Sequence, residues 1–417
     1  QVLASLLPEN TDRKRFLQAL GIHGDPIAAK RRIDRAKKSG ENLGLNPYGY
    51  SRAFQYRPSQ DDETWLLGEA RKAGVTLPTV LDPTAGGGSI PFESLRLGCN
   101  TFANDLNPVA VLVQKATYEW PAKHGREVLE VFNRLTERFL DLANPLYQGV
   151  YPPEASDVQI LGYVWARTIQ CPYCSGKIPL SPNWKLAPDG TGVRLLPQQG
   201  LGPGDNGRHC NFEIVKSQRE QSEGTAKGGS ATCPFPDCGR VINGDQIKKL
   251  AQGEGMGEQL FAVVYKEKLP AEYTKAGKPK KDKWKQCYRA PRDEDNNTEF
   301  IGALLTKKLP EWDALNLVPN EDFPVISNDD RPIQYGMPRW RDMFSARQLV
   351  AHGISVEVFS KIFQEEVSQE PVLSDVKRAA FGYLAIAIDR LIDWSSMQST
   401  WEQDKQRMAH TLSLIHI

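Results

Sequence analysis

The chain has 417 residues, of which 40% are hydrophobic and 25% charged, which is typical of a globular protein with a large core or several domains. The formal net charge is +1, so composition gives no overall signal for nucleic-acid binding, and any contact with DNA has to come from local basic patches. No apolar run is long enough to span a bilayer and no signal peptide is recognisable, so we expect a cytoplasmic protein with no membrane partner.

Helical patterns dominate the first part of the chain, up to residue 75. A basic stretch from Lys30 to Lys38 falls on one of these patterns, and a solvated helix face explains it better than a DNA contact does. We therefore expect a mostly helical N-terminal region.

An alternation of strand and helix signals follows this region. A short apolar strand is predicted at residues 79–82, a helix at 89–97 after a glycine cluster, and a second strand at 100–105. Asn107 and Pro108 then suit the N-cap and the first position of another helix. Such a run favours a parallel, doubly wound sheet, so the predicted fold class is α/β with a Rossmann-like core.

The turn after the first strand carries the strongest functional signal. Glycines at a strand-to-helix turn let a ligand approach the backbone closely. Asp105 follows Gly86 by 19 residues, at the tip of the next strand, where a carboxylate can accept hydrogen bonds from a ribose. This pattern predicts a cofactor that contains a nucleoside.

Three types of nucleoside cofactor compete for this turn. A nucleoside triphosphate site needs a lysine after the last glycine, but Ser89 follows Gly88. A dinucleotide site needs a third glycine where Pro91 stands, and Asp82 would repel its pyrophosphate. S-adenosylmethionine has no phosphate, and its sulfonium and ammonium groups are cationic, so a carboxylate at this position attracts it. We therefore expect S-adenosylmethionine.

Two pairs of cysteines form a second pattern. The chain has seven cysteines, and this spacing favours metal binding in a reducing compartment over disulfides. Four thiolates match a closed, tetrahedral structural zinc site. The predicted zinc ligands are Cys171, Cys174, Cys233 and Cys238. The adjacent His209 and Cys210 stay open as an alternative ligand pair, while Cys99 and Cys287 are interpreted as small buried side chains.

Periodicity predicts the remaining elements. These are an amphipathic helix at 125–143, strands at 260–265 and 286–289, and helices from about residue 345 and at 376–394. The segment 198–230, rich in Gly, Ser and Gln, is expected to be a mobile insertion. A lysine-rich hairpin tip at 266–285 is compatible either with a contact to the DNA backbone or with a solvated loop.

These motifs resemble a known family, the prokaryotic adenine-specific DNA methylases that contain a zinc ribbon. The segment Leu81–Glu93 resembles the family's cofactor motif, and Asn104–Pro108 resembles its ribose-binding motif. The resemblance covers the chain from about Leu43 to Thr411. It implies that the glycine turn lines the methionine end of S-adenosylmethionine, that Asp105 binds the ribose and that the next residue flanks the adenine. The cofactor-binding residues expected on this basis are Asp82, Pro83, Thr84, Ala85, Gly86, Gly87, Gly88, Asp105 and Leu106.

Methylases of this kind use an Asp/Asn/Ser-Pro-Pro-aromatic loop to accept hydrogen bonds from the adenine amino group and to stack on the flipped base. Three segments come close, but turns explain them better: Asn144–Tyr147, Tyr151–Glu154 and Ser181–Trp184. In the family the loop follows segments that resemble Tyr335–Trp340 and Asp389–Leu391, so we expect it beyond this sequence and expect the chain itself to be inactive. An incomplete sheet would also expose apolar positions of the last helix, namely Phe381, Leu384, Ile386, Ile388 and Leu391.

Both ends of the sequence are unusual. It begins with Gln1 rather than Met, and residues 412–417 resemble a translated sequencing adaptor, so we expect a non-native tail there and a natural protein that continues beyond about residue 411. The predicted organisation is a helical region (1–75), the first part of a Rossmann-like methyltransferase domain (76–155), a zinc-ribbon insertion with flexible and lysine-rich loops (156–295), a helical region leading back to the methyltransferase core (296–411) and the tail (412–417).

The function predicted from the sequence is an S-adenosylmethionine-dependent DNA methyltransferase specific for adenine N6, present as a fragment. Its cofactors would be S-adenosylmethionine and zinc, and its partners DNA and defence-system proteins. Two alternatives stay open: an amino methyltransferase acting on RNA or another nucleic acid, and a non-catalytic nucleic-acid-binding protein with a zinc ribbon.

Overall fold

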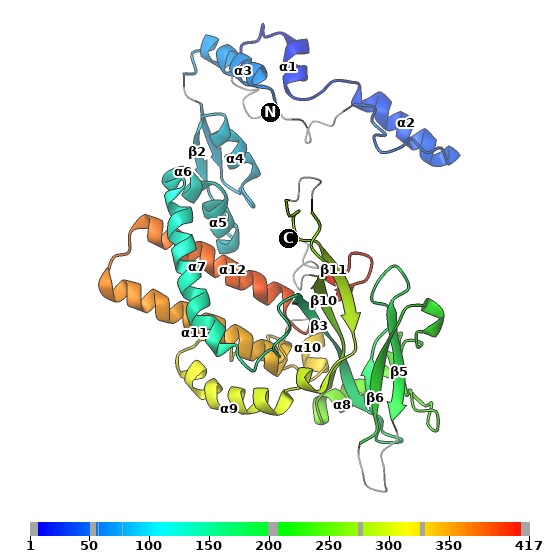
Figure 1. Cartoon of the computed structure of the whole chain (residues 1–417). Coiled ribbons are helices and arrows are strands. Elements are labelled where there is room, and N and C mark those ends of the chain that lie inside the picture. The colour runs from blue at the N-terminus through cyan, green and yellow to red at the C-terminus, as the bar shows by residue number, and fades with distance from the viewer. Residues whose placement is uncertain are drawn as a thin grey trace. The chain divides into compact units, whose positions relative to one another are not determined.

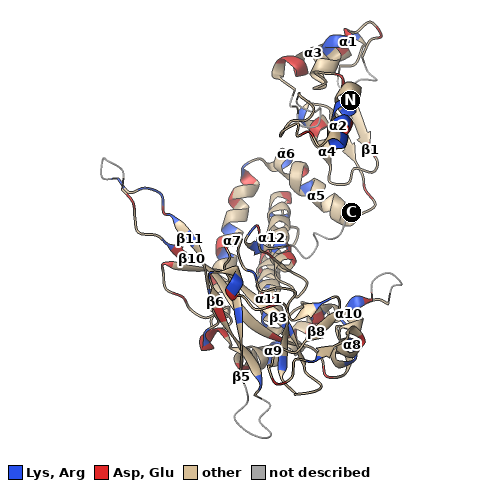
Figure 2. Cartoon of the chain, turned by 90° about the vertical axis from the view of Figure 1, so that its right-hand side faces the viewer, with Lys and Arg blue, Asp and Glu red and all other residues tan. Residues whose placement is uncertain are grey.

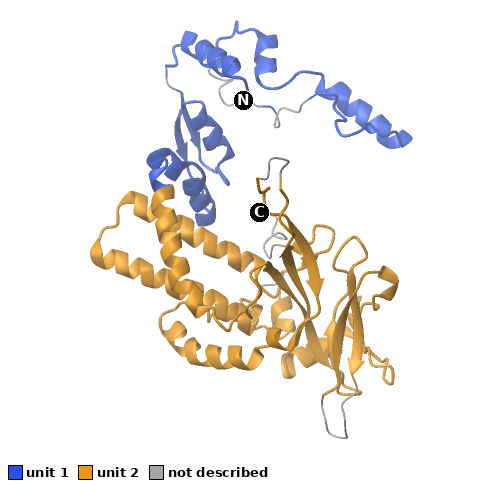
Figure 3. Ribbon diagram, viewed as in Figure 1, with its two compact units in different colours: residues 1–128 blue, residues 129–417 orange. Residues whose placement is uncertain are grey.

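A computed structural model of the chain describes residues 7–50, 56, 58–76, 78–198, 207–273, 278–325 and 330–409. It contains two compact units, residues 1–128 and 129–417, and each is considered by itself (Figure 3). Helices and strands are mixed along the chain, which confirms the α/β class at this coarse level. The predicted tail lies outside the described residues, and the predicted domain borders stay predictions. No helix in the described ranges combines the length and apolar character that crossing a membrane requires.

The first unit begins with helices α1 (Arg13–Ala19), α2 (Pro26–Ser39) and α3 (Gln60–Lys72). Asp12 and Asp25 cap the first two through their side chains, as Asp at an N-cap commonly does. A capping box between Ser59 and Asp62 starts α3, and Asp62 is 3% exposed. The hydroxyl of Tyr56 donates a hydrogen bond to Asp62, which lowers the pKa of that carboxyl to about 2.

A single β-α-β unit follows in the same unit of the chain (Figure 1). Strand β1 (Thr79–Asp82) pairs in parallel with β2 (Asn100–Ala103), and α4 (Ser89–Arg96) connects them. This confirms the predicted strand, helix and strand and their parallel pairing. The next elements are α5 (Pro108–Gln114), a π-helical turn (Lys115–Glu119) and α6 (Trp120–His124).

The second unit is organised around an antiparallel sheet of order β11-β10-β3-β4. Its strands are β3 (Val158–Gln170), β4 (Lys177–Leu180), β10 (Gly257–Lys268) and β11 (Trp284–Arg289). Strand β10 is buried continuously from Leu260 to Val264, and since successive side chains of a strand point to opposite faces, both faces are covered there. The smaller sheets comprise β5 (Gly192–Gln198) with β6 (His209–Val215), β7 (Ala226–Lys227) with β8 (Ser230–Thr232) and β9 (Val241–Ile242), and β12 (Trp401–Glu402) with β13 (Arg407–Met408).

The expectation of a mobile insertion at 198–230 is wrong for the described residues from 207 onward. They contain β6, β7 and the start of β8, and β6 pairs with β5 in an antiparallel ladder. Cys210 is fully buried and Val215 is 5% exposed. The polar composition misled because the segment still contributes buried residues such as Cys210 and Val215 to a paired strand.

Helices fill the rest of the second unit. They are α7 (Glu127–Leu146), which begins at the border between the units, α8 (Gly244–Gly253), α9 (Thr298–Ala314), α10 (Arg331–Gln334), α11 (Ala346–Gln369) and α12 (Asp375–Trp394), with short 3-10 turns at Gln218–Glu220, Asp293–Asp295 and Trp340–Met343. The predicted helices at 125–143 and 376–394, and the start near residue 345, are confirmed. Ser345 and Gln348 form the capping box that begins α11.

The expectation of an exposed apolar face on the last helix is largely wrong. Phe381, Leu384 and Ile388 are 4%, 3% and 6% exposed. Two aromatic rings of α11, Phe359 and Phe363, meet Phe381 edge-on at 5.8 and 5.2 Å between centroids. The helix pair α11–α12 therefore buries this face itself. Of the five residues expected on this face, only Leu391 is exposed, at 53%.

A close approach between α9 and α11 depends on Gly353. A Cβ atom at this position would lie 2.4 Å from Cζ3 of Trp312, which is fully buried. The indole nitrogen of Trp312 donates a hydrogen bond to Glu357 at 2.9 Å, so the ring is held and cannot move aside at low cost.

We expect Gly353→Ala to destabilise the second unit by about 1–3 kcal/mol through overpacking against Trp312. Gly302→Ala in α9 is the matched control, because nothing lies within 4 Å of its Cβ position. That change should raise stability by up to about 1 kcal/mol through helix propensity. Denaturant unfolding followed by tryptophan fluorescence measures both, and shifts of the same sign would contradict this account of the helix contact.

Candidate functional site

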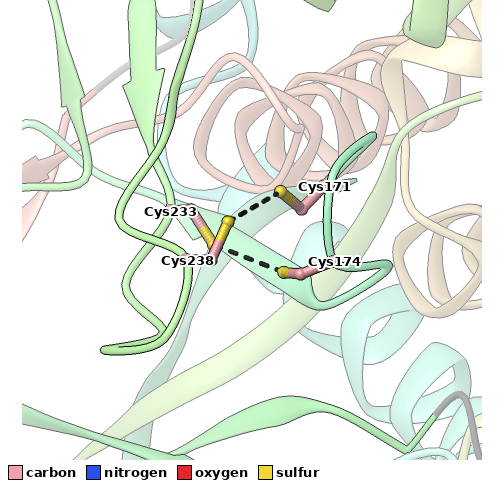
Figure 4. Close-up of side chains that lie close together, drawn as sticks. All are labelled: Cys171, Cys174, Cys233 and Cys238. Atoms are coloured by element: carbon pink, nitrogen blue, oxygen red, sulfur yellow. Dashed lines mark hydrogen bonds between the residues drawn. The ribbon is translucent and has the colours of Figure 1, made fainter.

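Two hairpins bring the four predicted zinc ligands together. Cys171 and Cys174 lie in the turn between β3 and β4, while Cys233 and Cys238 lie in the turn between β8 and β9. The four sulfur atoms all lie within 4.8 Å of one another, and the two turns face each other (Figure 4). The closest pairs are Cys171 with Cys238 at 3.8 Å and Cys174 with Cys233 at 3.7 Å.

This arrangement fits a tetrahedral metal ion. A tetrahedron with Zn–S bonds of about 2.3 Å places its sulfur atoms about 3.8 Å apart, which agrees with the closest pairs. Four thiolates are also the donor set that structural zinc prefers. The four cysteines can therefore hold a metal such as zinc, and a site with four protein ligands leaves no open position for catalysis.

The two turns share a backbone geometry. Ser175 and Gly239, each directly after the second cysteine of its pair, have φ angles of +57° and +56°. In the first turn the amide of Ser175 donates to the carbonyl of Cys171 at 2.9 Å, and in the second the amide of Gly239 donates to Phe235 at 3.0 Å. A positive φ at these positions lets the chain turn back and present both sulfur atoms on one side.

A buried aromatic ring, Phe235, packs beside the four cysteines. Phe235 is fully buried, and a Cβ atom at Gly176 would lie 2.3 Å from its ring, so only glycine fits there. The guanidinium carbon of Arg208 lies 4.8 Å from the centroid of the same ring, and Arg208 also forms an ion pair with Asp237. The position of the second turn is thus fixed by packing as well as by the sulfur atoms.

The thiols are not equivalent. Burial raises the pKa of Cys233 and of Cys174, whereas the amide of Arg240 donates a hydrogen bond that lowers the pKa of Cys238. A bound cation would favour all four thiolates, because metal ligation displaces the protons.

The alternative ligand pair lies elsewhere. Cys210 is fully buried in the core, and burial raises its pKa to about 12. The Nδ1 atom of His209 lies 2.5 Å from the carbonyl oxygen of Gly207. Neither residue belongs to the four-cysteine group, the metal-ligand cluster found among the described residues. Cys99 is buried as predicted, but Cys287 is only half-buried.

The glycine turn, Asp82–Gly88, follows β1 directly. Asp82 accepts a hydrogen bond from the amide of Thr84 at 3.2 Å, and the amide of Ala85 donates to the carbonyl of Asn104 beyond β2 at 2.9 Å. Gly86 and Gly88 have φ angles of +53° and +82°, which glycine adopts without strain. Gly86 and Gly88 therefore occupy positions that favour glycine.

Asp105 ties this turn to the end of the second strand. Its Oδ2 accepts a hydrogen bond from the amide of Gly86 at 2.7 Å, and its Oδ1 accepts one from the amide of Asn107 at 2.8 Å. These two bonds lower the pKa of Asp105 below its ordinary value, so the carboxylate stays charged near neutral pH. Each oxygen keeps a further lone pair for another donor. Leu106, the next predicted residue, is almost fully exposed.

The structure adds two residues that the sequence interpretation missed. The side-chain Nε2 of Gln114 donates to the carbonyl of Gly86 at 2.8 Å, and the hydroxyl of Tyr118 donates to Oε1 of Gln114 at 3.0 Å. A Cβ atom at Gly88 would lie 2.6 Å from the ring of Tyr118, so this tyrosine closes one side of the turn. The spacing of four residues, which puts both on one helix face, is the signal that could have identified them.

The three rejected catalytic-loop segments differ in their surroundings, and in the second, Tyr151–Glu154, Tyr151 is 39% exposed. Asn144 and Pro145 lie inside the last turn of α7. The hydroxyl of Tyr147 lies 2.7 Å from that of Ser355. Trp184 is 1% exposed, so its ring is not available for stacking on a base.

The lysine-rich tip joins β10 to β11, and Figure 2 shows acidic as well as basic residues along this hairpin. Lys280 and Lys283 pair with Glu272 at 3.2 and 2.6 Å, and Lys268 pairs with Asp282 at 2.8 Å. These partners reduce the local charge on which a DNA contact depends and favour the solvated loop. Residues 274–277 of the tip lie outside the described residues.

We expect purified protein to contain about one zinc ion per chain, and to lose it when Cys233→Ser and Cys238→Ser are combined. The matched control combines His209→Ala with Cys210→Ala and should retain the metal. Elemental analysis by mass spectrometry gives the stoichiometry. If the Cys233/Cys238 variant keeps zinc and the His209/Cys210 variant loses it, the zinc ligands include His209 and Cys210 instead.

Comparisons with known proteins leave the chain without an assigned family: no family model, no curated protein and no solved structure matches it.

Proposed function

We propose that this chain belongs to an S-adenosylmethionine-dependent DNA methyltransferase that acts on adenine N6 and carries a structural zinc ion. The observation that carries the proposal is the fixed backbone of Gly86, whose N–H donates to the carboxylate of Asp105 and whose carbonyl accepts from the side chain of Gln114. This residue lies at the carboxyl end of β1, beside the end of β2. Ligands of parallel α/β sheets bind outside the carboxyl ends of the strands. The β1-α4-β2 unit would then be the first part of a Rossmann-like core.

The shape of the turn supports a ligand that approaches the backbone. Chain neighbours aside, no atom of the described residues lies within 4 Å of the Cβ positions of Gly86 and Gly87, whereas Tyr118 closes off Gly88. The open side of the turn is therefore the side of the first two glycines, where a nucleoside could lie against bare backbone.

The charges of the turn favour a cationic ligand. Asp82 and Asp105 are both acidic, they lie at the ends of adjacent strands, and no lysine follows the glycines. A phosphate at this edge would be repelled, while sulfonium and ammonium groups would be attracted. S-adenosylmethionine, when bound, supplies a methyl group activated by its sulfonium. In this proposal Asp105 binds the ribose, Asp82 attracts the cationic end, and Gln114 holds the turn in the binding conformation.

The zinc centre has a structural role in this proposal. Four cysteine ligands leave no coordination position for a substrate. The preference for DNA and for adenine N6 rests on the resemblance of the two sequence motifs, and the proposal assigns no catalytic residue in the described part of the chain.

Asp105→Ala should weaken the binding of S-adenosylmethionine roughly tenfold to a hundredfold, since a charged hydrogen bond to a ribose is worth about 1.5–3 kcal/mol. Isothermal titration calorimetry with the full chain measures this. Asp61→Ala, which removes an exposed carboxylate on α3, is the control and should bind normally. Because the pKa of Asp105 is already lowered, binding should not titrate through this residue between about pH 5 and 8.

Equal affinity of Asp105→Ala and the unaltered chain would place the ribose elsewhere. If the unaltered chain shows no binding of S-adenosylmethionine while it retains zinc, the methyltransferase proposal is wrong and a non-catalytic zinc protein is favoured.

A further inference from the structure

A cleft of about 770 Å³ lies within the second unit, between the start of β3 and the helices α11 and α12. Its volume falls in the range of about 300–1,000 Å³ that is usual for ligand sites. Part of its wall is aromatic, formed by Tyr147, Tyr151, Tyr163, Trp165 and Trp394. None of these residues belongs to the zinc centre or to the glycine turn.

The aromatic wall offers a stacking surface. The rings of Tyr151 and Tyr163 stack with centroids 6.0 Å apart and planes inclined by 22°. Tyr151 is still 39% exposed, so it presents ring surface to the cleft mouth. Burial raises the pKa of Tyr151 and Tyr147, and raises that of Tyr163 to about 12, so all three phenols are neutral at physiological pH. A neutral aromatic surface suits a flat ligand.

A buried arginine supplies the polar group of the site. Arg347 is 7% exposed, and its guanidinium carbon lies 5.0 Å from the ring centroid of Tyr163 and 5.4 Å from that of Trp165. Its Nη2 donates to the carbonyl of Asp295 at 2.5 Å and to the side chain of Asn297. Within the described part of the chain, neither Nη1 of Arg347 nor the hydroxyl of Tyr163 has a hydrogen-bond partner. Such groups are rare in folded proteins, because burying them without a partner is costly.

The charge of the lining is positive. Arg347 and Arg390 both line the cleft, although Arg390 also pairs with Asp393 at 3.4 Å. Glu154, the acidic member of the lining, forms ion pairs with Arg289 and Arg292 outside it. His352 also lines the cleft, but burial lowers its pKa, so it is neutral. A ligand with a flat ring, hydrogen-bond acceptors and a nearby anion would match all of these features.

We propose that this cleft binds a nucleobase of single-stranded DNA, with the ring stacked on Tyr151 and an acceptor of the base facing Arg347. Base–aromatic stacking combined with arginine contacts is the general way in which proteins bind unpaired bases. Arg390, which is exposed on α12, supplies a cation for the adjacent phosphate. The inference rests on the proposed function for its choice of DNA as the nucleic acid.

The test is the binding of a fluorescein-labelled single-stranded DNA 12-mer of mixed sequence to the full chain, measured by fluorescence anisotropy. Tyr151→Ala should weaken binding roughly tenfold or more, because a stacking partner is lost. Tyr151→Phe keeps the ring and should bind like the unaltered chain. Leu391→Glu changes a lining residue that is 53% exposed, so it should leave the fold intact and weaken binding through repulsion of the phosphates.

Two results would overturn the proposal: no binding of the 12-mer by the unaltered chain, or unchanged affinity in both Tyr151→Ala and Leu391→Glu. Calorimetry with S-adenosylmethionine alone separates the two proposals. If the unaltered chain binds the 12-mer but not S-adenosylmethionine, the methyltransferase proposal is rejected and the cleft assignment stands. If it binds S-adenosylmethionine but not the 12-mer, only the cleft assignment is rejected.

Discussion

The contact between four sulfur atoms joins parts of the second unit that are far apart in the chain. Cys171 and Cys238 are separated by 67 residues, and Cys174 and Cys233 by 59. Closing loops of this length costs conformational entropy, which metal–thiolate bonds can offset. The closed segment contains β4 to β8, and its buried side chains share one core with the cysteines. Trp184 and Phe235 are the largest of these side chains. Packing therefore holds the arrangement that a bound metal ion would also stabilise.

The first unit is held together in a different way. The core beside its two strands consists of Val80 and Cys99 with Leu97 packed against them. The glycine turn is instead fixed by hydrogen bonds from side chains to backbone, through Asp105 and Gln114. Such a turn keeps its shape only while those side chains are present, because little apolar packing supports it. A change at either residue should therefore alter the turn before it alters the rest of the unit.

Local patterns in the sequence predict much of this structure. The strand–glycine–helix–strand run, the long helices and the pairing of cysteines all depend on neighbouring residues, and the structure has them where the sequence placed them. Features that depend on distant residues were missed. The last helix seemed to need a larger sheet to cover Phe381, but α11 covers it. The cleft wall combines residues near 150 with residues near 350, and no local pattern reveals that they meet.

Two further segments show why composition alone is an incomplete guide to the structure. Segment 207–230 is polar on average, yet β6 within it buries Cys210 and Val215, so average composition concealed this strand. Three lysines of the β10–β11 tip, Lys268, Lys280 and Lys283, pair with acidic residues of the same hairpin, while a contact with DNA stays a prediction. Net local charge depends on cross-strand neighbours, which the spacing of lysines alone does not show.

The central claim is that Cys171, Cys174, Cys233 and Cys238 close one tetrahedral metal site that organises the second unit. X-ray absorption spectroscopy at the zinc edge of the purified full chain tests it most directly. The account predicts a single shell of four sulfur atoms at about 2.3 Å. A first shell that contains nitrogen or oxygen, or fewer than four sulfur atoms, would contradict it.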